Sequence, residues 1–200
     1  MASKIDTSEG ERVWDPLVRL THWTIAAAVL LNGIFIEAES LAHVWIGYAA
    51  FGLLALRLVW GVIGTEEARF SSFPPSLSAA FGHIRDMFSG TRHTHRSHNP
   101  LGALMAYALW GMLLTVSVTG VMLESAPFPD GETGEHISQS YGEREEEGEE
   151  FVEEIHEVAA NLLLLLAALH VGGVALESRL SGRNLVGAMV AGVRKRKHRS

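Results

Sequence analysis

The hydrophobic residues of this chain are gathered into four blocks, and each block is interrupted only by single polar residues. The blocks cover residues 20–36, 44–63, 101–123 and 158–176. Each has the length that an α-helix needs to cross the roughly 30 Å hydrocarbon core of a bilayer. Helices on the surface of a soluble bundle would carry a polar stripe, which these blocks lack. The pattern therefore predicts four transmembrane helices.

The segments between the blocks differ in character. The turn at residues 37–42 is short, so the first two spans are expected to be antiparallel neighbours. In the loop 64–100, two prolines stop any helix, and residues 77–88 then show the pattern of a short amphipathic helix. Within the acidic loop 124–157, the stretch 126–150 is rich in Pro, Gly and Glu and is expected to be solvated and largely flexible. The fold class is therefore all-α: a four-helix transmembrane bundle forming one membrane domain over residues 1–200.

The distribution of charge predicts the orientation of the bundle. The formal net charge is −7, but the segment 124–157 alone holds thirteen acidic residues and one arginine. Lysine and arginine are instead concentrated before the first span, in the loop 64–100 and after the last span. Positive residues near the ends of spans mark the cytoplasmic side. Both termini, the loop 64–100 and its amphipathic helix should thus be cytoplasmic, and the acidic loop 124–157 should face the far side. The first block lacks a following cleavage signal and is interpreted as a retained span.

Four histidines stand at matching depths in these spans. His156 and His170 are fourteen residues apart, which keeps the same helix face and covers about 21 Å along the axis. His22 begins the first span on the cytoplasmic side, at the depth of His170. His43 begins the second span on the far side, at the depth of His156. The pairs His22–His170 and His43–His156 therefore predict two stacked metal or haem sites.

Two explanations compete for these histidines. Histidines at the ends of spans can be interfacial and bind nothing, whereas neutral imidazole is a standard axial ligand of haem iron. An ionisable residue inside a span indicates function by default, and His170 lies well inside an apolar run. The chain has no cysteine, so disulfides, thiolate ligands and covalent haem attachment through cysteine are excluded. Any haem would be held non-covalently.

Two arginines and several glycines extend this hypothesis. Arg57 lies fourteen residues after His43 and could contact a haem propionate or a quinone carbonyl, or it could reach the lipid headgroups. Arg19, one turn before His22, could serve in the same way or act as a topology anchor. Glycines in the spans would leave room for a porphyrin or allow close packing of helices: these are Gly33, Gly47, Gly52, Gly172 and Gly173.

Two polar segments carry weaker signals. His93, His95 and His98 could bind a metal, but no carboxylate accompanies them, and a solvated basic loop is the favoured interpretation. The acidic run before and around His156 could attract a basic protein such as a c-type cytochrome, or it could serve only for solvation.

Several motifs together resemble the bacterial cytochrome b561 family, which is related to the cytochrome b subunits of nickel–iron hydrogenase and formate dehydrogenase. They are VWDPLVRLTHW, HVWIGY followed by RLVWG, SHNPLGALM, and EEIHEVAANLLLLLAALHVGG followed by NLVGAMVAG. The resemblance implies a multi-pass protein of the bacterial inner membrane with two bis-histidine haem b groups that exchanges electrons with quinone. It also supports the pairs His22–His170 and His43–His156. The chain departs from the hydrogenase cytochromes in having a shorter turn between its first two spans. Its long acidic loop is particular to this chain.

Three functions follow from these observations. The leading hypothesis is a di-haem b-type cytochrome that carries electrons between the quinone pool and a redox partner such as a periplasmic c-type cytochrome. The resemblance also allows an enzyme, a superoxide oxidase that transfers electrons from periplasmic superoxide to quinone, although the acidic loop would repel this anion. A non-redox four-span membrane protein is the third. Membrane lipid and quinone or quinol are the expected partners, and no nucleic acid is expected.

Overall fold

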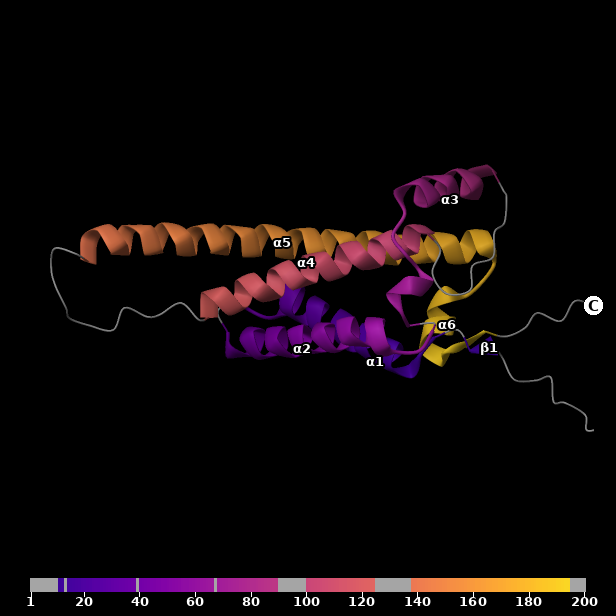
Figure 1. Cartoon of the computed structure of the whole chain (residues 1–200), viewed down its shortest axis with the longest axis horizontal. Helices are drawn as coiled ribbons and strands as arrows, with labels where there is room; N and C mark the ends of the chain where they lie inside the picture. Colours follow the sequence, from indigo (N-terminus) through magenta and orange to yellow (C-terminus); the bar gives the residue numbers. More distant parts are fainter. Residues whose placement is uncertain are drawn as a thin grey trace, which may run out of the picture. The chain divides into compact units, whose positions relative to one another are not determined.

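The computed structural model of the chain describes residues 11–12, 14–38, 40–66, 68–89, 100–124 and 138–194 (Figure 1). Helices dominate these residues, and the only strands among them form one short antiparallel pair. The elements are β1 (Glu11–Arg12), α1 (Pro16–Leu30), the π-helical segment η1 (Leu31–Phe35), α2 (Leu41–Ile63), the 3₁₀ segment η2 (Phe70–Ser72), α3 (Leu77–Ser89), α4 (Pro100–Glu124), α5 (Ser138–Ser181), α6 (Leu185–Ala191) and β2 (Val193–Arg194).

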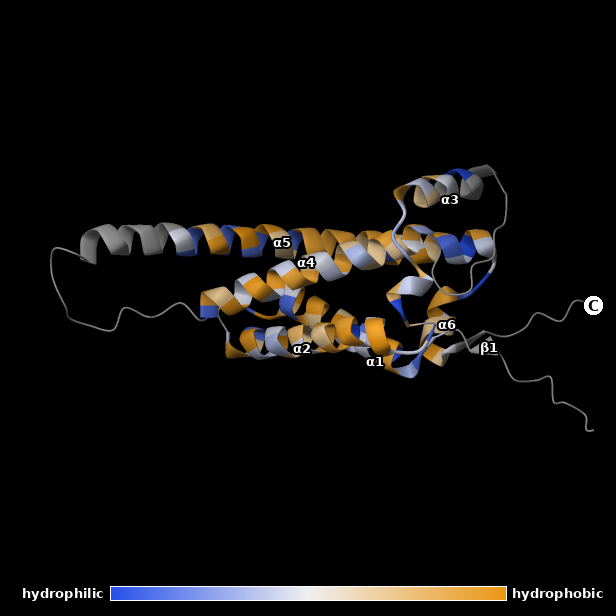
Figure 2. Cartoon of the chain, in the orientation of Figure 1, coloured by the Kyte–Doolittle hydropathy of each residue, from blue (hydrophilic) through white to orange (hydrophobic). Residues whose placement is uncertain are grey.

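The prediction of four transmembrane helices is confirmed. Within the described residues, four helical stretches are long and apolar enough to cross a membrane: Pro16–Phe35, Leu41–Ile63, Pro100–Glu124 and Gly148–Ser181. Hydrophobic residues predominate along α1, α2 and α4 and in the central part of α5 (Figure 2). Many of their large apolar side chains are exposed, as expected where lipid rather than water surrounds a helix. The short helix expected at residues 77–88 is found as α3.

The expectation that residues 126–150 form a largely flexible loop is wrong from Ser138 onward. Helix α5 begins at Ser138, so the acidic run lies on the same continuous helix as the last span. Glutamate has a high intrinsic helix propensity, and the two prolines of the segment, Pro127 and Pro129, both precede the helix. The composition of this stretch suggested a loop. The helix propensity of its glutamates, and the low cost of extending the helix of the last span, favour the observed helix instead.

Short polar residues determine where the first two spans begin. The Asp15 carboxylate accepts hydrogen bonds from the backbone N–H groups of Leu17 and Val18, at 2.8 and 3.3 Å, and thereby caps α1. Pro16 follows at the first helical position, where its missing N–H costs nothing. The Ser40 hydroxyl accepts a bond from the backbone N–H of His43 at 3.2 Å. This cap places His43 in the first turn of α2.

The chain divides into two compact units, and each transmembrane helix contributes residues to both. Unit 1 contains α1 up to Trp23, α2 from Arg57, α3, α4 up to Leu104, and α5 from His170 together with α6. Unit 2 contains the remaining parts of α1, α2, α4 and α5. Each unit has its own buried residues and one of the two predicted histidine pairs.

Small side chains make up much of the buried interior. More than half of the buried apolar residues in the described part of the chain are alanines, three in each unit. Small residues let helix backbones approach closely in a membrane, where van der Waals packing replaces the hydrophobic effect as the driving force. The buried alanines are Ala68, Ala80 and Ala103 in unit 1 and Ala28, Ala50 and Ala159 in unit 2.

Candidate haem-binding sites

The first histidine pair lies in unit 1. His22 on α1 faces His170 on α5, with ring centroids 6.3 Å apart and ring planes inclined at 61°. Trp23 makes an edge-to-face contact with the His22 ring at 5.1 Å. The Nδ1 atom of His22 is buried without a hydrogen-bond partner. The structure therefore brings together the two residues that were paired by their depth in the sequence.

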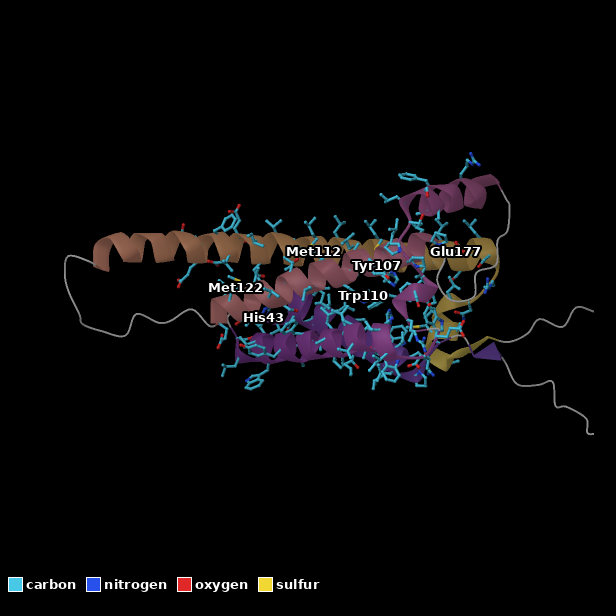
Figure 3. The ribbon with its side chains drawn as sticks, viewed as in Figure 1. His43, Tyr107, Trp110, Met112, Met122 and Glu177 are labelled. Atoms are coloured by element: carbon cyan, nitrogen blue, oxygen red, sulfur yellow. The ribbon has the colours of Figure 1, made fainter. Side chains whose placement is uncertain are left out.

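The second pair lies in unit 2 and has nearly the same geometry. His43 on α2 (labelled in Figure 3) faces His156 on α5, with ring centroids 6.3 Å apart and planes inclined at 63°. The Nδ1 atom of His43 is also buried without a partner. His156 differs, because its Nδ1 lies 3.0 Å from the hydroxyl oxygen of Thr119 on α4.

The distance between the rings indicates what could lie between them. A metal–imidazole bond is about 2 Å long and the ring centre is about 1 Å further out, so two opposed ligands have centroids about 6 Å apart. A direct hydrogen bond of about 3 Å between ring nitrogens would bring the centroids to about 5 Å. The observed 6.3 Å in both pairs is longer than a direct bond requires and leaves room for one metal atom, and it also lies within the range of ordinary edge-to-face ring contacts.

Haem fits this donor set better than a bare metal ion does. Among the residues that the structure describes, no group of three or more His, Asp or Glu side chains could hold a metal ion. A bare zinc site needs at least three protein ligands. A porphyrin supplies the equatorial ligands itself and needs only axial ones from the protein. Two opposed imidazoles are the axial set that a b-type haem requires.

The structure bears on one of the two roles considered for the glycines, close packing of helices. A Cβ atom at Gly33 would lie 2.8 Å from the Leu164 side chain, so this glycine serves close helix packing. At Gly52, Gly172 and Gly173, a Cβ would meet no atom within 4 Å. Gly173 lies three residues after His170, on the same helix face. Gly52, Gly172 and Gly173 are exposed, so open space there is also expected of a lipid-facing position, and the room for a porphyrin stays a prediction.

Both candidate arginines have partners in the protein. The Arg19 guanidinium donates to the backbone carbonyls of Met189, at 3.0 Å, and Val190, which belong to the last turn of α6, where a cation is favoured. Arg57 is buried, with 4% of its surface exposed, and donates to the Ala68 carbonyl at 3.2 Å. It also lies 5.6 Å from the centre of the Phe70 ring. The predicted propionate contacts of both arginines stay predictions.

Sequence reasoning missed two polar residues that contact the second pair. Besides Thr119, the Asn32 side-chain amide donates to the backbone carbonyl of His43 at 2.9 Å. Asn32 lies in the π-helical segment η1, and such segments are frequent at functional sites. Both are polar residues inside apolar spans, and this polarity is the feature of the sequence that could have identified them. Their partners depend on how the helices face each other, which spacing along one helix does not specify.

The remaining sequence signals are only partly covered. His93, His95 and His98 lie outside the described residues. The acidic residues around His156 are exposed on α5, and they include Glu149, Glu150, Glu153, Glu154 and Glu157. Near His156, the surface therefore carries strongly negative charge.

Taken together, the four spans and the two pairs of facing imidazoles define a multi-pass membrane protein of the kind that holds haem between its helices. A family model described as prokaryotic cytochrome b561 matches residues 13–192. The chain belongs to this family, which confirms the resemblance noted in the sequence. Membership makes it a membrane b-type cytochrome that binds haem b and takes part in electron transfer. Comparisons with curated proteins and with solved structures found no match.

Proposed function

We propose that the chain is a di-haem b-type cytochrome that carries electrons across the bacterial inner membrane between the quinone pool and a redox partner. His22 and His170 would be the axial ligands of one haem, and His43 and His156 those of the other. The observation that carries this proposal is the 6.3 Å distance between the ring centroids in both pairs. Bound haem supplies one-electron transfer at each site.

The ligand arrangement favours electron transfer over chemistry at the iron. With both imidazoles of a pair bound to the iron of a haem, no open position would be left on that iron for a substrate. Helix α5 contributes one ligand to each pair, which ties both sites to one continuous element. A quinol gives up two electrons on oxidation, and two one-electron centres match that number.

The proposed orientation places both termini in the cytoplasm. The distribution of Lys and Arg supports it, and the antiparallel pairing of Glu11–Arg12 with Val193–Arg194 agrees with termini on one side. The His43–His156 site would then belong to the periplasmic side. The exposed acidic residues of α5 favour a basic periplasmic partner, such as a c-type cytochrome. The same charges would repel superoxide, so a superoxide oxidase is not part of this proposal.

The proposal is tested on the purified chain in detergent. A spectrum of the oxidised protein minus that of the dithionite-reduced protein should show b-type haem bands, and a soluble short-chain quinol should reduce the haem. A basic c-type cytochrome added next should be reduced at a rate that falls as salt is raised, because steering by charge is screened. Absence of haem bands, or no reduction by quinol, would overturn the proposal. A superoxide–quinone rate above that of free haem would favour the enzyme instead.

A further inference from the structure

We infer that Thr119 is a positioning residue for His156, and that its hydroxyl lowers the redox potential of the haem held by His43 and His156. This inference rests on the proposed function, because it requires haem at that pair. Thr119 is buried on α4, with 7% of its surface exposed. Its hydroxyl oxygen lies 3.0 Å from Nδ1 of His156, within hydrogen-bond distance.

The surroundings of the hydroxyl favour one direction for this bond. The Thr119 oxygen also lies 2.8 Å from the carbonyl of Thr115 and 3.1 Å from that of Val116. A carbonyl can only accept, and a hydroxyl has one proton, so that proton is directed toward the carbonyls. The remaining lone pairs can then accept from Nδ1–H of His156. With the proton on Nδ1, the lone pair of Nε2 is available to a metal.

Helix α4 approaches the His156 ring closely at this point. A Cβ atom on Gly120, the next residue, would lie 3.1 Å from Cε1 of His156 and 3.5 Å from Nδ1. The missing side chain at Gly120 therefore leaves the space in which the ring lies. A hydrogen bond in such a buried place is stronger than one in water. Thr119 and Gly120 together restrict the rotation of the ring.

Two of the other candidate ligands lack such a bond. Among the described residues, the Nδ1 atoms of His22 and His43 are buried without a hydrogen-bond partner. When the imidazole nitrogen that does not bind the metal donates a hydrogen bond to an acceptor, the imidazole becomes a more basic ligand. A more basic axial ligand donates more electron density to iron and stabilises the ferric state. The bond from His156 to Thr119 should therefore lower the potential of the haem that His156 would hold.

The experiment compares three variants by redox potentiometry of the haem-loaded protein. Thr119→Val keeps the shape but removes the hydroxyl and leaves the Val116 carbonyl as the other acceptor beside the His156 ring. One of the two midpoint potentials should therefore rise, and the other should stay unchanged. Affinity for that haem should fall by about 10- to 100-fold, the usual cost of losing an outer-shell partner. Thr119→Ser restores the hydroxyl and should return the potential toward that of the wild type.

Thr115→Val is the matched control. The Thr115 hydroxyl makes the same kind of bond, 3.0 Å from the Gly111 carbonyl, but it is exposed and has no histidine partner. Both potentials should be unchanged in this variant. Two unshifted potentials in a Thr119→Val protein that binds two haems would overturn the inference and leave the proposed function intact. If the valine variant loses the haem, a serine variant that fails to regain it would also overturn the inference. Wild-type protein without haem would instead remove the proposed function.

Discussion

The side-chain amide of Asn32 donates a hydrogen bond to the backbone carbonyl of His43, at 2.9 Å. This bond connects the π-helical segment that ends the first span to the first turn of α2, across the short turn between them. The carbonyl belongs to a candidate ligand, so the contact fixes the backbone from which the His43 ring projects.

Replacing Asn32 by Leu should weaken haem binding in unit 2 with little effect on overall stability. The lost hydrogen bond contributes about 1 kcal/mol, while removal of the buried Oδ1, which has no partner, recovers about as much. Haem titration should show a lower affinity for one haem, and thermal unfolding should be nearly unchanged. Asn161→Leu, at an exposed position on α5, is the control and should alter neither. A large loss of stability without a change in haem affinity would contradict this account.

Replacing Gly120 by Ala should disturb the His156 site, because the new Cβ would lie 3.1 Å from the ring. The ring has to move by a few tenths of an ångström, so we expect a lower haem content and a shifted optical spectrum. Gly111→Ala on the same helix is the control, since a Cβ there meets no atom within 4 Å. That variant should keep its haem and gain roughly 0.5–1 kcal/mol from helix propensity. Equal haem contents in the two variants would count against the close approach of α4.

Replacing Arg57 by Met should destabilise the protein by about 3 kcal/mol. A hydrogen bond from a charged donor contributes about 1.5–3 kcal/mol, and the contact with the Phe70 ring adds about 1–2 kcal/mol at a buried position. Arg179→Met, at an exposed site on α5, should change stability by less than about 0.5 kcal/mol. Unfolding in detergent would measure both. Equal stability of the two variants would show that Arg57 does not hold the segment containing Ala68 and Phe70.

The inclination of the histidine rings predicts a magnetic signature. If the planes keep their inclinations of 61° and 63° when haem is bound, the π-interactions of the two imidazoles with iron would oppose each other, and two of the iron d orbitals would stay close in energy. The oxidised protein should therefore give strongly anisotropic low-spin ferric signals in electron paramagnetic resonance. Signals typical of parallel imidazoles in both haems would contradict the ring geometry.

The sequence predicted the spans and the pairing of the histidines because both depend on one-dimensional rules. The length of an apolar block is fixed by the bilayer, and depth in the membrane follows from position along a helix. The contacts of Thr119 with His156 and of Arg19 with α6 depend on how helices face each other, and no spacing within one helix specifies that. The start of α5 at Ser138 was missed because composition was given more weight than the helix propensity of glutamate.

The most direct measurement of the central claim is the ratio of haem b to protein in the wild type and in single histidine variants. We expect two haems per chain in the wild type and one in His170→Ala, with no further loss when His22→Ala is added, because these two residues share one haem. His83→Ala, on α3 outside the spans, should retain two. Two haems in the His170→Ala protein, or one in the wild type, would contradict the assignment of each histidine pair to its own haem.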